Sequence, residues 1–161
     1  MIRPAEAGDF TAIAAITNHY IATSSIHFGY EPVTAAELAA GWRGHARHPW
    51  LVHVEDAVIA YAKAGVWRER AAYAWTCELG IYVAHDARGR GIGGALYRAL
   101  IDEVRTRGFR SAIAGITLPN PGSVALHERL GFRSIGIVRE AGFKHERWHD
   151  VAFYQLPLAE D

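Results

Sequence analysis

The sequence predicts a layered α/β fold: one mixed, mostly antiparallel sheet of about six to seven strands, flanked by about four helices. Short apolar runs typical of strands recur along the chain, and several of them are separated by breaks that suit hairpins. A long amphipathic segment, from about Gly91 to Arg107, separates two of these runs, and a crossover of that length joins parallel strands. We therefore expect one parallel strand pair within an otherwise antiparallel sheet.

Length and composition favour a single domain over residues 1–161. The chain has 161 residues, of which 50% are hydrophobic and 21% charged, and this is enough to fill one compact core. Seventeen basic side chains balance seventeen acidic ones, so no global field favours nucleic acid or a membrane surface as a partner. The single cysteine, Cys77, excludes an internal disulfide framework, and the start lacks a signal-like apolar run. We expect a cytoplasmic protein.

Each element is predicted from its periodicity and from the residues that begin and end it. Helices are expected where apolar residues recur every three or four positions, and strands where β-branched and aromatic residues form short runs. Residues 34–37 are a capping box, Asn120 with Pro121 begins the last helix, and Gly108 ends the crossover helix. In chain order we expect strand 2–5, helices 10–21 and 35–42, strands 50–54, 58–67 and 73–79, helix 91–107, strand 111–118, helix 121–130, and strands 132–143 and 148–156.

The stretch from Cys77 to Leu96 reads as an apolar strand, a glycine-rich loop and the start of a helix. Missing side chains in such a loop let backbone N–H groups approach a ligand, and the helix adds the positive end of its dipole. The nucleotide P-loop is excluded because Ala95 follows Gly93-Gly94 where lysine is required. A dinucleotide fingerprint is excluded because no acidic residue stands about 20 positions later. The expected ligand is a phosphate or pyrophosphate.

Glu78 is predicted to lie in the middle of a strand, on a face with small neighbours. An ionised carboxylate is costly there unless it is paired or hydrated, so Glu78 indicates a wet cavity, and partial burial would raise its pKa toward that of a general base. Pairing with an arginine, or a position at the sheet edge, are the alternatives. Gly80 is expected to mark a β-bulge that splays the strand and frees the N–H groups of residues 81–83.

Three further sets of side chains have two interpretations each. Phe28 and Tyr30, in an aromatic loop, either line a substrate pocket or cover a core edge. His127 borders the apolar face of the last helix and is either functional or a packing residue. Nine histidines raise the question of a metal, yet His145 and His149, on an expected turn, lack an acidic or cysteine cluster at ligand spacing. We expect no metal.

Arg88, Gly91 and Gly93, directly after a strand, resemble the acyl-CoA pyrophosphate loop of the GNAT superfamily of N-acetyltransferases. The run 120–132 resembles the second signature of that superfamily. Segments 49–52, 73–78, 126–132 and 141–151 are similar to the branch that acetylates phosphinothricin and methionine sulfoximine. The resemblance extends from Ile2 to about Leu158, which is essentially the whole chain.

The resemblance implies a GNAT fold, with the sheet splayed between two parallel central strands, and acetyl-CoA as cosubstrate. Glu78 would be the catalytic base and His127 its accompanying histidine. The cofactor-binding residues would be Ile81, Tyr82, Val83, Arg88, Gly89, Arg90, Gly91, Ile92, Gly93, Gly94 and Asn120. The candidate substrate-binding residues are Phe28, Tyr30, Arg70, Tyr73 and Lys144, with Arg68 as a further anion partner.

The same resemblance implies a small-molecule amine acceptor, a homodimer, and a role in antibiotic or herbicide resistance. Two alternatives remain open. One is an N-acetyltransferase acting on another amine, such as a polyamine or a peptide N-terminus, and the other is an acyl-CoA-binding sensor or partner module without turnover. The residues at 29–30 and 146–147 differ from those of the branch's resistance enzymes, so phosphinothricin itself is not assured as the acceptor.

Overall fold

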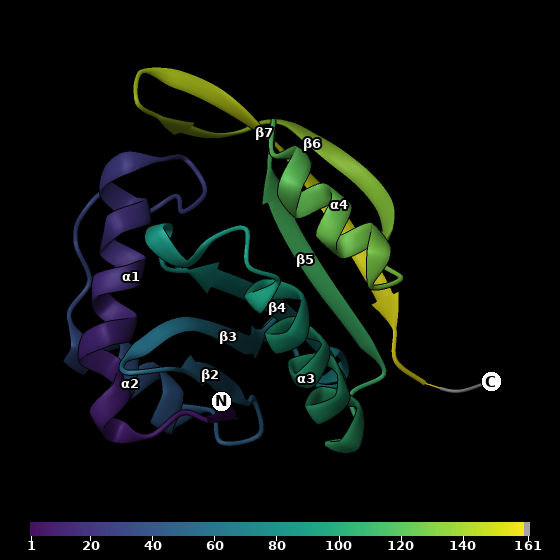
Figure 1. The fold of residues 1–161 in the computed structure, drawn as a ribbon. Coiled ribbons are helices and arrows are strands. Elements are labelled where there is room, and N and C mark those ends of the chain that lie inside the picture. The colour runs from purple at the N-terminus through teal and green to yellow at the C-terminus, as the bar shows by residue number, and fades with distance from the viewer. Residues whose placement is uncertain (160–161) are drawn as a thin grey trace.

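A computed structural model describes residues 1–159 and contains one seven-stranded sheet with the strand order β1-β2-β3-β4-β5-β7-β6. Figure 1 shows how the strands twist across the molecule. The strands are β1 (Ile2–Pro4), β2 (Trp50–Val54), β3 (Val58–Val66), β4 (Thr76–Val83), β5 (Ser111–Thr117), β6 (Arg133–Lys144) and β7 (Arg147–Pro157). The α-helices are α1 (Phe10–Thr23), α2 (Ala35–Gly44), α3 (Ile92–Thr106) and α4 (Pro121–Arg129). Short 3-10 helices cover Ala7–Asp9, Ala71–Tyr73 and His85–Ala87. The predicted fold class is confirmed.

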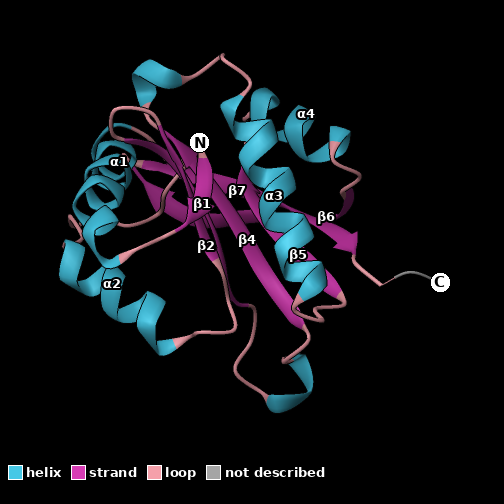
Figure 2. Cartoon of the chain, turned by 60° about the horizontal axis from the view of Figure 1, so that its bottom comes forward, coloured by secondary structure: helices cyan, strands magenta, loops and turns pink. Residues whose placement is uncertain are grey.

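The helices lie on both faces of the sheet, with α1 and α2 on one face and α3 and α4 on the other (Figure 2). Under α1 and α2, a smaller core is built around Phe10, Ile13 and Tyr61. Under α3 and α4, a larger core includes Leu96 and Leu100 of α3. Because side chains alternate along a strand, β4 directs Cys77 and Leu79 into the larger core and Glu78, between them, to the opposite face.

The sheet splits between its two parallel strands. The strands β4 and β5 pair over three residues each, Thr76–Glu78 with Ser111–Ile113, and both continue beyond this pairing. The expected β-bulge at Gly80 is wrong, because β3 and β4 pair without a register shift from Val83 to Cys77. The split therefore arises from the divergence of β4 and β5, which leaves the inner edges of both strands unpaired.

Two boundaries also differ from the prediction. The strand expected from residue 73 begins at Thr76, because residues 71–73 form a turn of 3-10 helix. Tyr73 and Trp75 are accordingly exposed and do not share the buried face of Cys77. His149, expected in a turn, lies within β7 and pairs with Gly142 of β6. Aromatic residues favour strands in general, which is why the sequence pattern extended β4 to residues 73 and 75.

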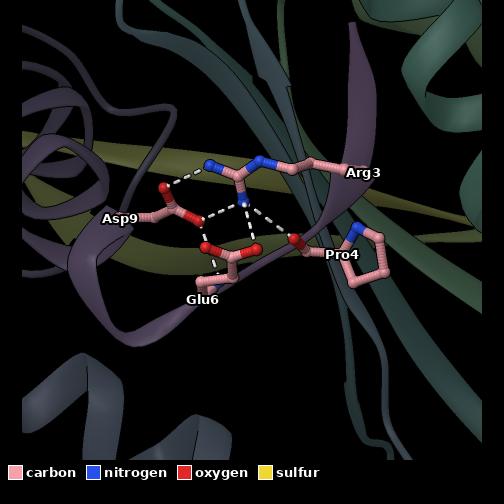
Figure 3. A network of polar contacts seen from close by, with 4 residues as sticks. All are labelled: Arg3, Pro4, Glu6 and Asp9. Carbon is pink, nitrogen blue, oxygen red and sulfur yellow. Dashed lines mark hydrogen bonds and ion pairs between the residues drawn. The ribbon is translucent and has the colours of Figure 1, made fainter.

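An ion pair joins β1 to the start of α1 (Figure 3). The Arg3 guanidinium donates two hydrogen bonds to the Asp9 carboxylate, of 2.7 and 2.8 Å, and the Glu6 N–H donates a third, of 2.7 Å. Asp9 is buried, and the hydrogen bonds from Arg3 hold its pKa below its usual range. Such a bidentate, partly desolvated pair fixes the entry of the chain into α1.

Replacing this carboxylate is expected to destabilise the protein in a pH-dependent way. Asp9→Asn should lower the free energy of unfolding at neutral pH by about 2 kcal/mol, because it leaves the Arg3 charge without its partner. Since folding lowers the pKa of Asp9, the stabilisation is present above the ordinary pKa of an aspartate and is lost as the pH falls through the folded value. Urea unfolding of both proteins at neutral and acidic pH measures the difference.

The control is Glu6→Gln, which removes an ion pair of 4.0 Å with a largely exposed carboxylate. It should change the free energy of unfolding by less than about 0.5 kcal/mol. A difference between Asp9→Asn and the native chain that does not shrink in acid would contradict the assignment of the stabilisation to the ionised Asp9.

Candidate active site

The predicted anion loop lies between the end of β4 and the start of α3. Gly89 and Gly91 both have a φ of +77°, a conformation that side chains disfavour. Gly91 is the N-cap of α3, so it contributes no side chain to the first N–H groups of the helix. These groups stay available to an anion, and the positive end of the helix dipole reinforces them.

A cavity of about 370 Å³ opens in front of this loop. Every predicted cofactor residue except Arg90 lines it. Sequence reasoning missed the side chains on the other walls, which are Tyr20, Ile26, Ala87, Gly122, Ser123, Leu126 and Arg129. The residues contributed by α4 could have been predicted from the sequence. Residues 123, 126 and 129 follow one another at three-residue spacing, so they share one face of the helix.

The side chain of Arg90 does not line this cavity. Its Nη2 atom lies 2.5 Å from Oε1 of Glu55, in the turn between β2 and β3, so its guanidinium is held away from the cavity. Local patterns in the sequence do not predict this partner, because Glu55 lies 35 residues away from Arg90 in the chain.

The backbone of β4 is divided between the sheet and the cavity. The Ala84 N–H donates to the Ile59 carbonyl of β3, and in an antiparallel pair such bonds recur at every second residue. The unbroken register therefore turns the N–H of Tyr82 toward β3 and the N–H groups of Ile81 and Val83 toward the opening. Tyr20 donates its hydroxyl proton to the Val83 carbonyl, which holds this end of the strand. Of the three residues predicted to contact the cofactor through their backbone, Ile81 and Val83 have N–H groups that face the opening. Tyr82 lines the cavity, but its N–H group is directed to β3.

A second, narrower cavity of about 70 Å³ occupies the gap where β4 and β5 diverge. It is lined by residues 79–82 of β4, residues 115–117 of β5, and Ile26, Asn120, Ser123 and His127. Ile26 and Asn120 line both cavities, so the gap continues the larger one into the split of the sheet.

His127 lines this gap with both ring nitrogens engaged. Nδ1 lies 2.7 Å from the Ser123 carbonyl oxygen, and Nε2 lies 3.0 Å from the Tyr97 hydroxyl. A carbonyl only accepts, so Nδ1 carries the proton and the neutral Nε2 accepts from Tyr97. Burial lowers the pKa of His127, although the Ser123 bond opposes this shift. Burial thus favours the neutral histidine, in which the Tyr97 hydroxyl occupies the lone pair of Nε2.

Glu78 lies on the opposite face of β4 from Leu79, outside both cavities. Its cross-strand neighbour on β3 is Gly65, whose missing side chain leaves the carboxylate reachable, and the side chain is exposed. Neighbouring protein atoms still remove enough water to raise its pKa, and the Lys63 ammonium opposes this rise. The carboxylate is therefore accessible, and its pKa is moved in the direction that suits a general base.

Arg68 and Tyr73 form an exposed cluster with Trp67 beyond the end of β3. The Arg68 guanidinium lies 5.1 Å from the Trp67 ring and 6.0 Å from the Tyr73 ring, and Trp67 packs edge-on against Phe153 of β7 at 5.8 Å. Phe153 faces Gly115 of β5. By strand alternation this is the face of the sheet that carries Glu78. Arg70, also exposed, begins the 3-10 turn that ends at Tyr73.

Phe28, Tyr30 and Lys144, predicted to bind the substrate, line neither of these cavities and join the aromatic loop to the β6–β7 hairpin. The Phe28 ring packs against Gly142, and the Tyr30 hydroxyl donates to the Phe143 carbonyl. Lys144 is 5% exposed, and its ammonium donates to the carbonyls of Ile21 and His27. These partners are more than 100 residues apart in sequence, beyond the reach of local patterns.

Within residues 1–159, no group of three or more histidine, cysteine, aspartate or glutamate side chains comes together to hold a metal ion. Over the same residues, none of the helices has the length and apolar character that crossing a bilayer requires.

An anion loop at the end of one of two diverging parallel strands, with a gap lined by both strands beside it, suits an enzyme that holds a pyrophosphate-bearing acyl donor at the split of its sheet. The chain belongs to the GNAT family of acetyltransferases, whose family model matches residues 13–132. It is an N-acetyltransferase that uses acetyl-CoA as the acyl donor.

Relatives extend over nearly the whole chain. A phosphinothricin N-acetyltransferase of Streptomyces viridochromogenes is 47% identical, with 96% of this chain and 85% of that protein covered. An L-methionine sulfoximine/L-methionine sulfone acetyltransferase of Pseudomonas aeruginosa is 37% identical, with 98% and 94% covered. The crystal structure of a phosphinothricin acetyltransferase from Sinorhizobium meliloti in complex with acetyl-CoA superposes with a TM-score of 0.92, at 38% identity over 99% of this chain and 88% of that one.

Proposed function

We propose that this chain, working as one domain over residues 1–161, acetylates the amino group of a small amino-acid analogue of the phosphinothricin or methionine sulfoximine type. The observation that carries the proposal is the arrangement about the split sheet. The donor loop opens on one side of the gap, whereas Glu78 and the cluster of Arg68, Trp67 and Tyr73 lie on the other face. The names of the relatives supply the acceptor class.

The cofactor residues fit a pyrophosphate-bearing donor because the glycine loop keeps its N–H groups open and no side chain fills the cradle at Gly89 or Gly91. Bound acetyl-CoA supplies an activated thioester. The residues of the loop, together with Asn120, would hold its phosphates and arm. The N–H groups of Ile81 and Val83, turned toward the gap, are the donors available to a carbonyl oxygen that gains negative charge.

Glu78 is the proposed general base. An ammonium acceptor must lose a proton before it attacks a thioester, and Glu78 takes this proton either directly or through a water molecule. Arg68 and Arg70 are the proposed partners of an anionic group on the acceptor, and Tyr73 is a candidate wall of its site. Guanidinium groups suit this task because they pair with planar carboxylates through two parallel hydrogen bonds.

His127 contributes through Tyr97 in this proposal. Since the Tyr97 hydroxyl donates to Nε2, a proton reaches or leaves the histidine at that atom only when Tyr97 turns away or relays it. The neutral pair can protonate a departing thiolate only after the histidine has taken up a proton, for instance one released by the acceptor nitrogen, and Glu78 deprotonates the acceptor ammonium from the other face.

Lys63 is expected to set the pH range of the base. Its ammonium lowers the pKa of Glu78 against the effect of burial, so Lys63→Met should raise that pKa. Because the base works only when ionised, the acid limb of kcat/KM should move to higher pH. Rate profiles at saturating acetyl-CoA measure the shift. Lys63→Arg keeps the charge and should leave the limb near its native position, and an unmoved limb in Lys63→Met would contradict the coupling.

The acceptor is tested by thiol release from acetyl-CoA with four amines: phosphinothricin, methionine sulfoximine, a polyamine and a peptide with a free N-terminus. Turnover with the first two, and kcat/KM at least tenfold lower with the others, is the expected result. Preference for a polyamine or a peptide would redirect the proposal within the family. Tight binding of acetyl-CoA with no turnover on any amine would favour a sensor module instead.

We propose a homodimer that forms through the face of β6. This strand is the edge of the sheet, and its exposed side chains include Ile135, Ile137 and Val138. Long apolar edge strands pair readily with a second copy. Sedimentation should give twice the monomer mass, and Ile137→Lys should yield monomers, whereas a native monomer would refute the proposal.

Location and physiological role complete the proposal. Acetyl-CoA is supplied in the cytoplasm, which is where the enzyme would work. Acetylation of an amino-acid analogue that is toxic to the host would confer resistance. Expression in a sensitive bacterium should raise the tolerated concentration of phosphinothricin or methionine sulfoximine, and expression of Glu78→Gln should not.

A further inference from the structure

The aromatic loop, residues 24–30, is attached to the tip of the β6–β7 hairpin, and Figure 1 shows this tip reaching over the C-terminal end of α1. The Lys144 ammonium donates to the His27 carbonyl at 2.6 Å and to the Ile21 carbonyl at 2.7 Å. Two further polar contacts join the loop to the hairpin tip. The hydroxyl of Tyr30 donates to the Phe143 carbonyl, and Nε2 of His145 lies 3.3 Å from the Ser24 carbonyl oxygen. The loop and the hairpin tip thus form one unit.

Lys144 is the central tie of this unit. The Ile21 carbonyl belongs to the last turn of α1, where carbonyls lack a partner within the helix and a cation is favoured by the helix dipole. Within residues 1–159, no carboxylate forms an ion pair with Lys144. Both hydrogen bonds of this buried ammonium therefore go to main-chain carbonyls, and removal of Lys144 leaves those carbonyls without their donor.

Ile26 is the residue that this unit carries to the active site. It lies in sequence between Ser24 and His27, whose carbonyls His145 and Lys144 hold. Its side chain lines the donor cavity, the gap between β4 and β5, and a third cavity beside the hairpin. It therefore stands where these spaces meet.

A substitution at Gly142 perturbs the same loop and hairpin tip without changing Lys144. The Phe28 ring lies so close to the Cα of Gly142 that a methyl group at position 142 would collide with the ring. The missing side chain thus forms a notch that seats Phe28. Gly142→Ala should displace the loop without touching Lys144 or the donor loop.

We propose that Lys144 is a positioning residue for acyl transfer, which ties the aromatic loop to the hairpin and so holds Ile26 in the wall of the gap. The inference rests on the proposed function, because the position of Ile26 matters to the reaction only if the acceptor amine meets the donor in that gap. Lys144 contacts neither the donor loop nor the cavities lined by residues 88–94, so its effect is expected on the acceptor and on kcat.

The test compares Lys144→Met with the native chain. We expect kcat/KM for the acceptor to fall by about tenfold or more, since a misplacement of the order of 1 Å can cost up to about a hundredfold. The dissociation constant of CoA should change much less, by about threefold at most, because the pyrophosphate loop is unchanged and Ile26 is one of many residues that line the donor cavity. Lys144→Arg, which keeps donors for both carbonyls, should restore most of the activity, and Arg98→Met, which removes an exposed cation from α3, should have no effect.

Two further measurements separate positioning from stability. If Lys144 acts through Ile26, then Lys144→Met combined with Ile26→Ala should lose little more activity than Ile26→Ala alone. Gly142→Ala, which keeps the charge, should reproduce the loss for the acceptor if Lys144→Met is too unstable to assay. Additive losses, or native kcat/KM in a folded Lys144→Met that has only a lower Tm, would overturn the proposal.

Hydrogen exchange of the free protein makes the inference testable without turnover. Amides of residues 24–30 should exchange faster in Lys144→Met, while those of α3 should not. Unchanged exchange in the loop would overturn the role of Lys144. If the native chain turned over none of the four amines, the proposed function would fail while the exchange result still decided whether Lys144 holds the loop.

Discussion

Glu78→Gln is expected to lower kcat at neutral pH by about 10²- to 10⁴-fold, the range associated with loss of a general base. Glutamine has nearly the same shape as glutamate but cannot take the proton of the acceptor ammonium. The carboxylate lies across β4 from the donor cavity, next to Gly65 and near Lys63, so the variant should leave the dissociation constant of CoA unchanged. Steady-state kinetics and calorimetric titration with CoA check the two halves of this expectation.

The pH dependence strengthens this test. A rate that depends on ionised Glu78 rises with pH through the pKa of Glu78, which burial raises. Glu78→Gln should lose this acid limb of the pH–rate profile. Glu69→Gln removes an exposed carboxylate close to Arg68 and should keep both the rate and the limb. Native turnover by Glu78→Gln would remove Glu78 from the mechanism.

Gly93→Glu is expected to weaken the binding of CoA by at least about a hundredfold. Gly93 lines the donor cavity in the first turn of α3, and a side chain added there begins within 4 Å of Val83 and Ile81 and extends into the cavity. Its carboxylate would take the place of the pyrophosphate at the positive helix end and repel it. Titration with CoA measures the loss, which should appear equally with desulfo-CoA, because the phosphates are the affected group.

The matched control is Ala95→Glu. Ala95 is exposed in the same turn but does not line the cavity, so the variant adds the same charge near the same helix end without filling the site. It should weaken CoA binding by no more than a few fold, in keeping with a screened dipole interaction. Equal losses in the two variants would mean that the loop attracts the donor by its field alone and not by a fitted cradle.

The divergence of β4 and β5 explains why one stretch of chain serves both substrates. Residues 81 and 83 present N–H groups to the gap, while Glu78, three residues earlier, points to the other face. A strand alternates its side chains, so a single strand can supply a backbone donor on its free edge and a base on one face. This arrangement requires the neighbouring parallel strand to diverge from β4, and β5 does so after residue 113.

Most elements of the fold were predictable because their signals are local. The crossover helix, its capping residues and the antiparallel hairpins lie within short windows, and the structure has them close to the expected bounds. The bulge at Gly80 was not predictable in this way. A glycine in a strand is compatible with a bulge or with a regular ladder, and only the pairing with Lys63 on β3 decides between them.

The sequence by itself determined the anion loop, the position of Glu78 in a central strand and the family, because each depends on residues that are neighbours in the chain. Tertiary structure decided the rest. It turned Arg90 to Glu55, paired His127 with Tyr97, and directed Lys144 to carbonyls of the aromatic loop. The physical reason is that a long polar side chain takes the nearest unsatisfied partner in space, and no local pattern of residues records which distant segment will supply it.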